Sequence, residues 1–70
     1  MNGMPLTGRE EQVLHALTSS ATNDQIAKAL GITTNTVKDH VLRLHRKLGV
    51  KNRIQLLIAA ENAGLIQLLP

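Results

Sequence analysis

The stretch NDQIAKALGITTNTVKDHVLRL, residues 23–44, carries the clearest fold signal in the chain. Apolar residues recur in it at the three- and four-residue spacing of a helix face, on both sides of the short connection GIT at 31–33. A connection of this length with a glycine makes two helices cross steeply, as in a helix-turn-helix. Gly31 provides the positive φ of the turn, Ala27 is small enough for the close approach, and Val37 anchors the second helix.

Capping patterns and glycines predict where the helices begin and end. The sequences TGRE (7–10), TNDQ (22–25) and NRIQ (52–55) have the form of capping boxes, in which the first and fourth residues bond each other's amides. Thr33 is expected to cap the third helix, and a glycine follows the second, third and fourth helices. The chain is therefore predicted to be all-α, a four-helix domain at 6–66 with a central helix-turn-helix and flexible ends at 1–5 and 67–70. The helices are expected at about 8–19, 23–30, 34–48 and 53–63.

Length and composition exclude several classes of protein. A chain of 70 residues forms one small domain, and without cysteine it has neither disulfides nor a thiolate zinc site. Its core must be aliphatic because the sequence contains no Phe, Trp or Tyr. No stretch approaches the roughly 18 apolar residues of a membrane span, and the start MNGMPLTGREE has no apolar secretory region. The sequence therefore predicts a cytoplasmic protein without membrane contact.

Positive charge is concentrated in one segment. Residues 38–53 contain six of the eight Lys and Arg residues and one acidic residue, while the net charge of the whole chain is +3. Such a concentration is typical of a polyanion-binding surface, although a solvated helix face is the other interpretation of a charge run. Lys38, Leu42 and His45 follow one another at i, i+4 and i+7, so they are expected to form one outward ridge. The major groove of B-DNA, about 12 Å wide, admits a single helix.

The predicted fourth helix is apolar on nearly all sides. One stripe must close the core, and the remaining apolar side chains would be exposed in a monomer. We interpret this surplus as a contact surface, with self-association as its simplest use and a merely exposed apolar surface as the alternative. The residues expected at this dimer interface are Ile54, Leu57, Ile58 and Glu61.

Four segments together resemble a known family, the LuxR-type (NarL/FixJ, GerE) helix-turn-helix domains of bacterial transcription factors. They are LTGREEQVLHAL at 6–17, NDQIAKALGI at 23–32, TVKDHVLRLHRKLGVKNR at 36–53 and AGLI at 63–66. The resemblance implies a DNA-binding domain whose third helix reads the major groove and whose fourth helix forms a dimer in many members. Gly8, where Pro is common, and Ser20, where Gly is common, depart from the family pattern.

The base-reading positions that the resemblance implies fall on Lys38, Asp39 and Leu42. Lys38 agrees with the usual pattern and is expected to contact guanine or phosphate. Asp39 and Leu42 depart from it, which should change the sequence that is read. Asp39 could accept from a cytosine amino group, repel phosphate, or pair with Arg43 at i+4. Leu42 could contact a thymine methyl or be one of the single exposed leucines common on protein surfaces.

Contacts to the DNA backbone are expected from two groups of residues. Polar residues at the start of the third helix can bond phosphate where the helix dipole also favours anions, and Thr33 serves as the cap as well. Basic residues farther along would contact phosphate without reading sequence, although each alone could be an idle surface charge. The predicted backbone contacts are Thr33, Thr34, Asn35, Thr36, Arg43, Arg46, Lys47 and Lys51.

The side-chain patterns that other functions require are not recognisable in the sequence. His15, His40 and His45 fit no metal-binding spacing, and His40 is expected to be a packed, hydrogen-bonded structural residue. No nucleophile–base pair, glycine-rich phosphate loop or carboxylate dyad is present, so we predict no enzyme, no cofactor and no metal site. Single-stranded DNA or RNA is disfavoured because no aromatic side chain is available to stack on bases.

Two alternatives to the LuxR-type interpretation remain open at the level of the sequence. A sigma-factor module for the promoter −35 element has a similar recognition helix, but it usually lacks an apolar fourth helix ending in AGLI. A helical protein-interaction module acting through the fourth helix would leave the cationic segment unexplained. The expected partners are double-stranded DNA with an inverted-repeat operator, a second copy of the chain, and an N-terminal receiver or ligand-sensing domain if the parent protein is longer.

Overall fold

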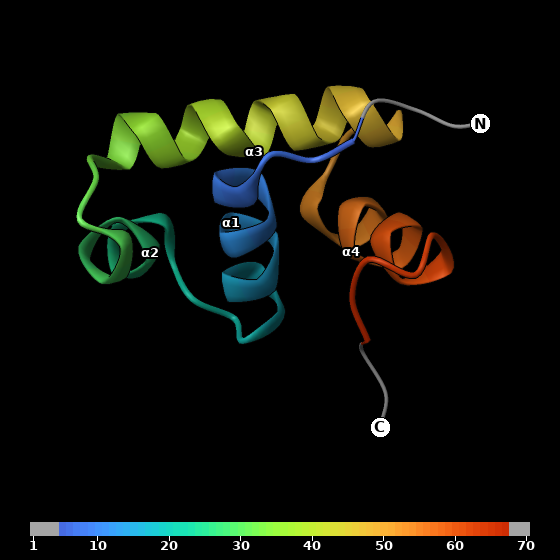
Figure 1. Cartoon of the computed structure of the whole chain (residues 1–70), viewed down its shortest axis with the longest axis horizontal. Helices are drawn as coiled ribbons and strands as arrows, with labels where there is room; N and C mark the ends of the chain where they lie inside the picture. Colours follow the sequence, from blue (N-terminus) through green and yellow to red (C-terminus); the bar gives the residue numbers. More distant parts are fainter. Residues whose placement is uncertain (1–4, 68–70) are drawn as a thin grey trace.

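The structure, a computed structural model, describes residues 5–67 and consists of four helices (Figure 1). Helix α1 spans Gly8–Thr18, α2 Asn23–Leu30, α3 Thr34–Leu48 and α4 Arg53–Asn62. No strand occurs within the described range, which confirms the all-α prediction. The flexible ends predicted at 1–5 and 67–70 fall outside that range, apart from Pro5 and Gln67.

Local side-chain caps explain where the first two helices begin. The Thr7 hydroxyl accepts from the Glu10 amide at 3.1 Å, while the Glu10 carboxylate accepts from the Thr7 amide at 2.9 Å. Thr22 and Gln25 form the same reciprocal pair at 3.1 and 2.8 Å. Both predicted capping boxes are confirmed. Gly31, with φ of 69°, ends α2 in the left-handed conformation that the turn requires.

The third predicted capping box is only half formed. The Asn52 side chain accepts from the Gln55 amide at 2.9 Å, but the Gln55 side chain accepts from the amide of Lys51 at 2.9 Å. The backbone of Asn52 has φ of −146°, whereas the caps of α1 and α2 have −75° and −76°. This more extended backbone places a different amide beside the Gln55 side chain.

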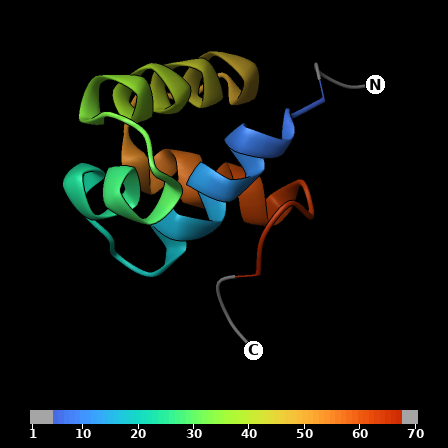
Figure 2. The same ribbon diagram turned by 60° about the vertical axis from the view of Figure 1, so that its left-hand side comes forward.

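Helix α3 is the central element of the fold. It lies along one side of the molecule and contacts α1, α2 and α4 (Figures 1 and 2). Figure 1 shows α2 nearly end-on while α3 lies across the view, so the two helices cross steeply, as predicted for a helix-turn-helix. The side of α3 that faces away from the other helices is left open.

The core is aliphatic and receives side chains from every helix. Ala27 is 5% exposed, as expected for a small residue where helices approach closely. Full burial of a Leu, Ile or Val side chain stabilises the folded state by about 1.5–3 kcal/mol, so these residues supply the main driving force. The buried apolar residues are Val13, Leu14, Leu17, Ile26, Ala27, Val37, Leu44, Leu56, Ala60 and Ile66.

One ion pair is enclosed in this small domain. Glu10 is 1% exposed, and its carboxylate lies 2.6 Å from the ammonium of Lys47, which also donates to the Pro5 carbonyl at 3.1 Å. Burial raises the pKa of Glu10, but the hydrogen bonds from Lys47 and Thr7 and the charge of Lys47 outweigh this effect, and the pKa lies below its ordinary value. The pair joins the first turn of α1 to the last turn of α3.

Arg53, the first residue of α4, also points inward. Its Nη2 donates to the Leu17 carbonyl at 2.6 Å, and its Nη1 donates to the Ala21 carbonyl at 3.3 Å. The guanidinium therefore ties the start of α4 to the end of α1 and the following loop. Although Arg53 belongs to the cationic segment of the sequence, its charge is used within the fold.

Candidate nucleic-acid interface

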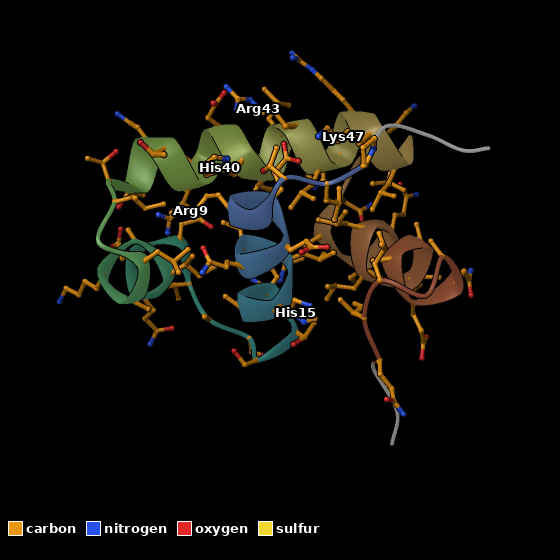
Figure 3. The ribbon with its side chains drawn as sticks, viewed as in Figure 1. Arg9, His15, His40, Arg43 and Lys47 are labelled. Atoms are coloured by element: carbon orange, nitrogen blue, oxygen red, sulfur yellow. The ribbon has the colours of Figure 1, made fainter. Side chains whose placement is uncertain are left out.

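The side of α3 opposite the core forms one continuous surface. Val37 and Leu44 are fully buried, and the exposed residues are gathered on the other side of the helix. At 3.6 residues per turn these exposed residues fall within a sector of about 140°. Figure 3 shows Arg43 on this side of α3, pointing away from the other helices. We define the outer face of α3 as the exposed residues Asn35, Lys38, Asp39, Leu42, Arg43 and Arg46.

The start of α3 is surrounded by hydroxyl groups. Thr33 accepts from the Thr36 amide at 3.1 Å, and the two hydroxyl oxygens are 2.9 Å apart. The capping role predicted for Thr33 is confirmed. The Thr34 hydroxyl donates to the carboxylate of Asp24 in α2 at 2.7 Å, a contact that the sequence did not indicate.

Asp39 and Arg43 form an ion pair on the outer face. Nη2 of Arg43 lies 2.8 Å from Oδ2 of Asp39, one helical turn apart, and both side chains are about half exposed. This pairing was one of three interpretations of Asp39 in the sequence. A pair of this kind stabilises a helix by only about 0.3–0.5 kcal/mol, so an approaching polyanion can readily draw Arg43 away.

Apolar and basic side chains stand side by side on the outer face. Leu42 is 46% exposed, and Lys38, one turn earlier, is also exposed. Lys51, in the loop after α3, is exposed as well. These three residues are accessible to a ligand, as expected from the sequence.

Two residues expected on the outward side of α3 instead lie against the rest of the domain. The Lys47 side chain is 14% exposed and bonded to Glu10, so it is not a freely exposed cation. His45 is half-buried, and its Nε2 is enclosed without a hydrogen-bond partner among the described residues. Lys47 lies three residues after the buried Leu44, and His45 lies four residues after the half-buried Val41, so both adjoin the packed side of the helix, whereas Arg46 points to the opposite side. The expected ridge therefore does not extend to His45.

His40 is packed, but not with the expected hydrogen bond. It is half-buried, and its Nδ1 is enclosed without a partner in the described part of the chain. His15 lies on α1, well separated from His40 in Figure 3. Within residues 5–67 no group of three or more His, Cys, Asp or Glu side chains is arranged to hold a metal ion. No helix in this range is long and apolar enough to cross a membrane.

Helix α4 divides its apolar side chains between the core and the surface. Leu56 and Ala60 are buried, while Ile54 and Ile58 are 72% and 51% exposed. Leu57, predicted at the dimer interface, is instead partly buried against the core. Glu61 is also half-buried. The two exposed isoleucines lie one helical turn apart and form a small apolar surface.

The sequence of the chain matches the family described as "Bacterial regulatory proteins, luxR family" over residues 4–60. This match covers both helices of the helix-turn-helix and most of α4. The chain belongs to the LuxR family of bacterial regulatory proteins.

Individual relatives of this LuxR-family chain support the assignment. The HTH-type transcriptional regulator MalT of Vibrio campbellii is 43% identical over 65 residues, which cover 93% of this chain and 7% of MalT. The structure of the transcription factor GerE superposes with a TM-score of 0.85 at 32% identity, covering 90% of this chain and 94% of GerE. Vibrio cholera VqmA, solved as a complex with ligand and DNA, superposes with a TM-score of 0.83 at 32% identity, covering 89% of this chain and 27% of VqmA.

Membership of the LuxR family confirms the resemblance seen in the sequence. The chain is a helix-turn-helix DNA-binding domain of the LuxR type and not a catalytic domain. The match to the LuxR family decides against the sigma-factor alternative. The chain spans only a small part of MalT and of VqmA but nearly all of GerE.

Proposed function

We propose that this domain binds double-stranded DNA in a sequence-specific manner by inserting α3 into the major groove. The observation that carries the proposal is the outer face of α3, which is continuous, exposed and bordered at its start by hydroxyl groups. Helix α3 also contacts each of the other helices, so its orientation is fixed before DNA arrives. A preorganised helix loses little conformational freedom on binding.

The base contacts are assigned to Lys38, Asp39 and Leu42. Lys38 can donate to guanine O6 and N7, and Leu42 can contact a thymine methyl group. Asp39 holds Arg43 in the free domain, so a base contact by Asp39 requires that the ion pair open. An exposed leucine within a mostly polar surface supports apolar contact with a base over phosphate binding.

We assign contacts with the DNA backbone to polar residues on the outer face of α3 and next to it. Thr33, Asn35 and Thr36 lie at the N-terminus of α3, where backbone amides and the helix dipole favour phosphate. Basic residues supply the sequence-independent part of the affinity. The proposed basic contacts are Arg43, Arg46 and Lys51, and Lys47 is left out because it pairs with Glu10.

Fluorescence anisotropy with a labelled duplex of mixed sequence tests the proposal. We expect binding that weakens steeply between low and moderate salt. Lys38→Ala should weaken binding, and the salt slope should fall by about one if Lys38 contacts phosphate. An unchanged slope with altered sequence preference would assign Lys38 to a base. His15→Ala, on exposed α1 surface, serves as the control. A folded domain that does not bind the duplex at low salt contradicts the proposal.

We further propose that two copies of the domain bind together through α4. The exposed Ile54 and Ile58 support this, with Leu57 and Glu61 at the border of the surface. Two recognition helices related by a twofold axis would address half-sites about 10 base pairs apart in an inverted repeat. MalT and VqmA are much longer than this chain, which supports a longer parent protein, and we propose that its N-terminal part is the receiver or sensing domain that supplies the signal.

Selection of preferred sites from a random duplex library tests the dimer. The expected product is an inverted repeat bound by two chains. Ile54→Glu should leave a folded domain that binds each half-site separately and more weakly, and Gln55→Glu, an exposed neighbour, should keep paired binding. Selected sites without symmetry, or paired binding retained by Ile54→Glu, would exclude α4 as the interface.

A further inference from the structure

The hydrogen bond between Asp24 and Thr34 connects the two helices of the helix-turn-helix at the edge of the proposed DNA surface. Thr34 is the first residue of α3, and Asp24 lies in the first turn of α2. The donor and acceptor oxygens are 2.7 Å apart. Asp24 is exposed and Thr34 is half-buried, so the carboxylate lies at the surface next to the start of α3.

The chemistry of this contact limits what Thr34 can do for DNA. A hydroxyl group has one hydrogen to donate, and a phosphate oxygen can only accept. While Thr34 donates to Asp24, it cannot donate to phosphate. The neighbouring Thr33 and Thr36 hydroxyls bond to each other, without a charged partner, so one of them remains able to turn toward DNA.

The charge of Asp24 has a second effect at the same place. A phosphate that approaches the N-terminus of α3 meets the favourable dipole of the helix, but also a carboxylate bonded to the first residue of that helix. Like charges a few ångströms apart repel one another even in water. In the first turn of α2 the same carboxylate is favourable for the helix, so its structural and DNA-binding effects have opposite signs.

We propose that Asp24 restrains backbone binding at the N-terminus of α3, by retaining the Thr34 hydroxyl and by repelling phosphate. The inference rests on the proposed DNA-binding function. It makes Asp24 a positioning residue and shifts the contacts that hold the DNA backbone toward Arg43, Arg46 and Lys51. It also limits the affinity of the domain for duplex DNA of any sequence.

A double-mutant cycle on the full chain tests the inference, with the labelled mixed-sequence duplex as the probe. Asp24→Ala should raise the affinity roughly threefold to fivefold at low salt, and the gain should shrink as salt screens the charge. Thr34→Val alone should leave the affinity within about twofold, because its hydroxyl is already engaged. In the Asp24→Ala background, Thr34→Val should reverse part of the gain. Glu11→Gln, exposed on α1, removes one negative charge elsewhere and is the control.

Three results overturn the inference. One is an unchanged or lower affinity for Asp24→Ala while the wild type binds, which leaves the proposed function intact. Another is a gain no larger than that of Glu11→Gln, which assigns the effect to net charge. The third is a loss of more than about threefold for Thr34→Val alone, which shows a hydroxyl already bonded to phosphate. If neither the wild type nor any folded variant binds, the proposed function and this inference fail together.

Discussion

The carboxylate of Glu10 and the ammonium of Lys47 are 2.6 Å apart. The two residues are 37 positions apart in the chain, and their ion pair joins α1 to α3. Glu10 also completes the capping box of α1. One buried side chain thus both starts a helix and holds the end of the proposed recognition helix.

Glu10→Gln should destabilise the domain by about 3 kcal/mol, the lower end of the cost of breaking a buried ion pair. The glutamine can still accept from the Thr7 amide, so the loss reports mainly on Lys47, which is left with a mostly buried charge. Urea denaturation followed by circular dichroism measures the change. Glu11→Gln, an exposed neighbour, should shift the unfolding free energy by less than about 0.5 kcal/mol. An equally small effect of Glu10→Gln would show that the Glu10–Lys47 pair makes no net contribution to the stability of the domain.

The same carboxylate predicts a dependence of stability on pH. Because the pKa of Glu10 is lowered in the folded state, the unfolded chain binds more protons in the acid range, and the unfolding free energy increases with pH there. The contribution is complete above the ordinary pKa of 4.5 and is lost as the pH falls through the lower, folded value. Urea midpoints of the wild type and Glu10→Gln should therefore converge on acidification. A constant difference across the acid range would contradict the lowered pKa.

Arg46 and Lys47 are adjacent in sequence but should have separate roles. Arg46→Gln should reduce the magnitude of the salt slope of DNA binding by about one, with little change in stability. Lys47→Met should lower the unfolding free energy and leave the salt slope unchanged, because its charge is already paired with Glu10. Anisotropy titrations and urea denaturation of the two variants provide both values. Equal salt slopes of DNA binding for the two variants would contradict the separate roles of Arg46 and Lys47.

Ser20 has a positive φ of 62°, the one such non-glycine residue in the described part of the chain. The left-handed conformation costs a residue with a Cβ roughly 1 kcal/mol, so Ser20→Gly should raise the unfolding free energy by about that amount. Ser19 has φ of −94° and donates its hydroxyl to the Ala16 carbonyl, so Ser19→Gly should instead destabilise. Thermal denaturation of both variants gives the comparison. Destabilisation by Ser20→Gly would mean that its backbone is not strained.

Arg53→Lys tests the link between α1 and α4. A lysine keeps the charge but cannot place two donors in the fixed fork that reaches the Leu17 and Ala21 carbonyls. We expect a loss of about 1.5–3 kcal/mol in unfolding free energy, the range of a hydrogen bond that involves a charged group. Lys51→Gln, in the exposed loop, should have little effect on stability but should weaken DNA binding. An unchanged unfolding free energy for Arg53→Lys would show that a single donor at this position is enough to link α1 and α4.

Local signals made most of the fold predictable. A capping box involves residues three apart, and a glycine after a helix acts on its own backbone, so both are legible without knowledge of distant segments. Ala27 and Val37 were identified because their roles follow from the short GIT turn. The half-formed cap at Asn52 could not be predicted, because it depends on a backbone angle that the sequence does not specify.

The charged residues were harder to interpret because their partners come from distant parts of the chain. Lys47 and Arg46 look alike in the sequence, and only the position of Lys47 beside the stripe of Val37 and Leu44 distinguishes them. The helical spacing therefore indicates that Lys47 faces the domain, but nothing in the sequence identifies Glu10 as the partner of Lys47. The same holds for Arg53, whose acceptors are backbone carbonyls and carry no sequence signature.

Helix α3 is at once the proposed reading element and the helix that contacts all the others. It therefore cannot tilt or unwind without opening the aliphatic core. A regulatory signal has little means of altering the shape of this domain. In the proposed dimer, such a signal would act on the domain as a rigid body, by covering it or by changing the distance and angle between the two copies. Regulation would thus appear as geometry between domains, with each recognition surface unchanged in the active and inactive states.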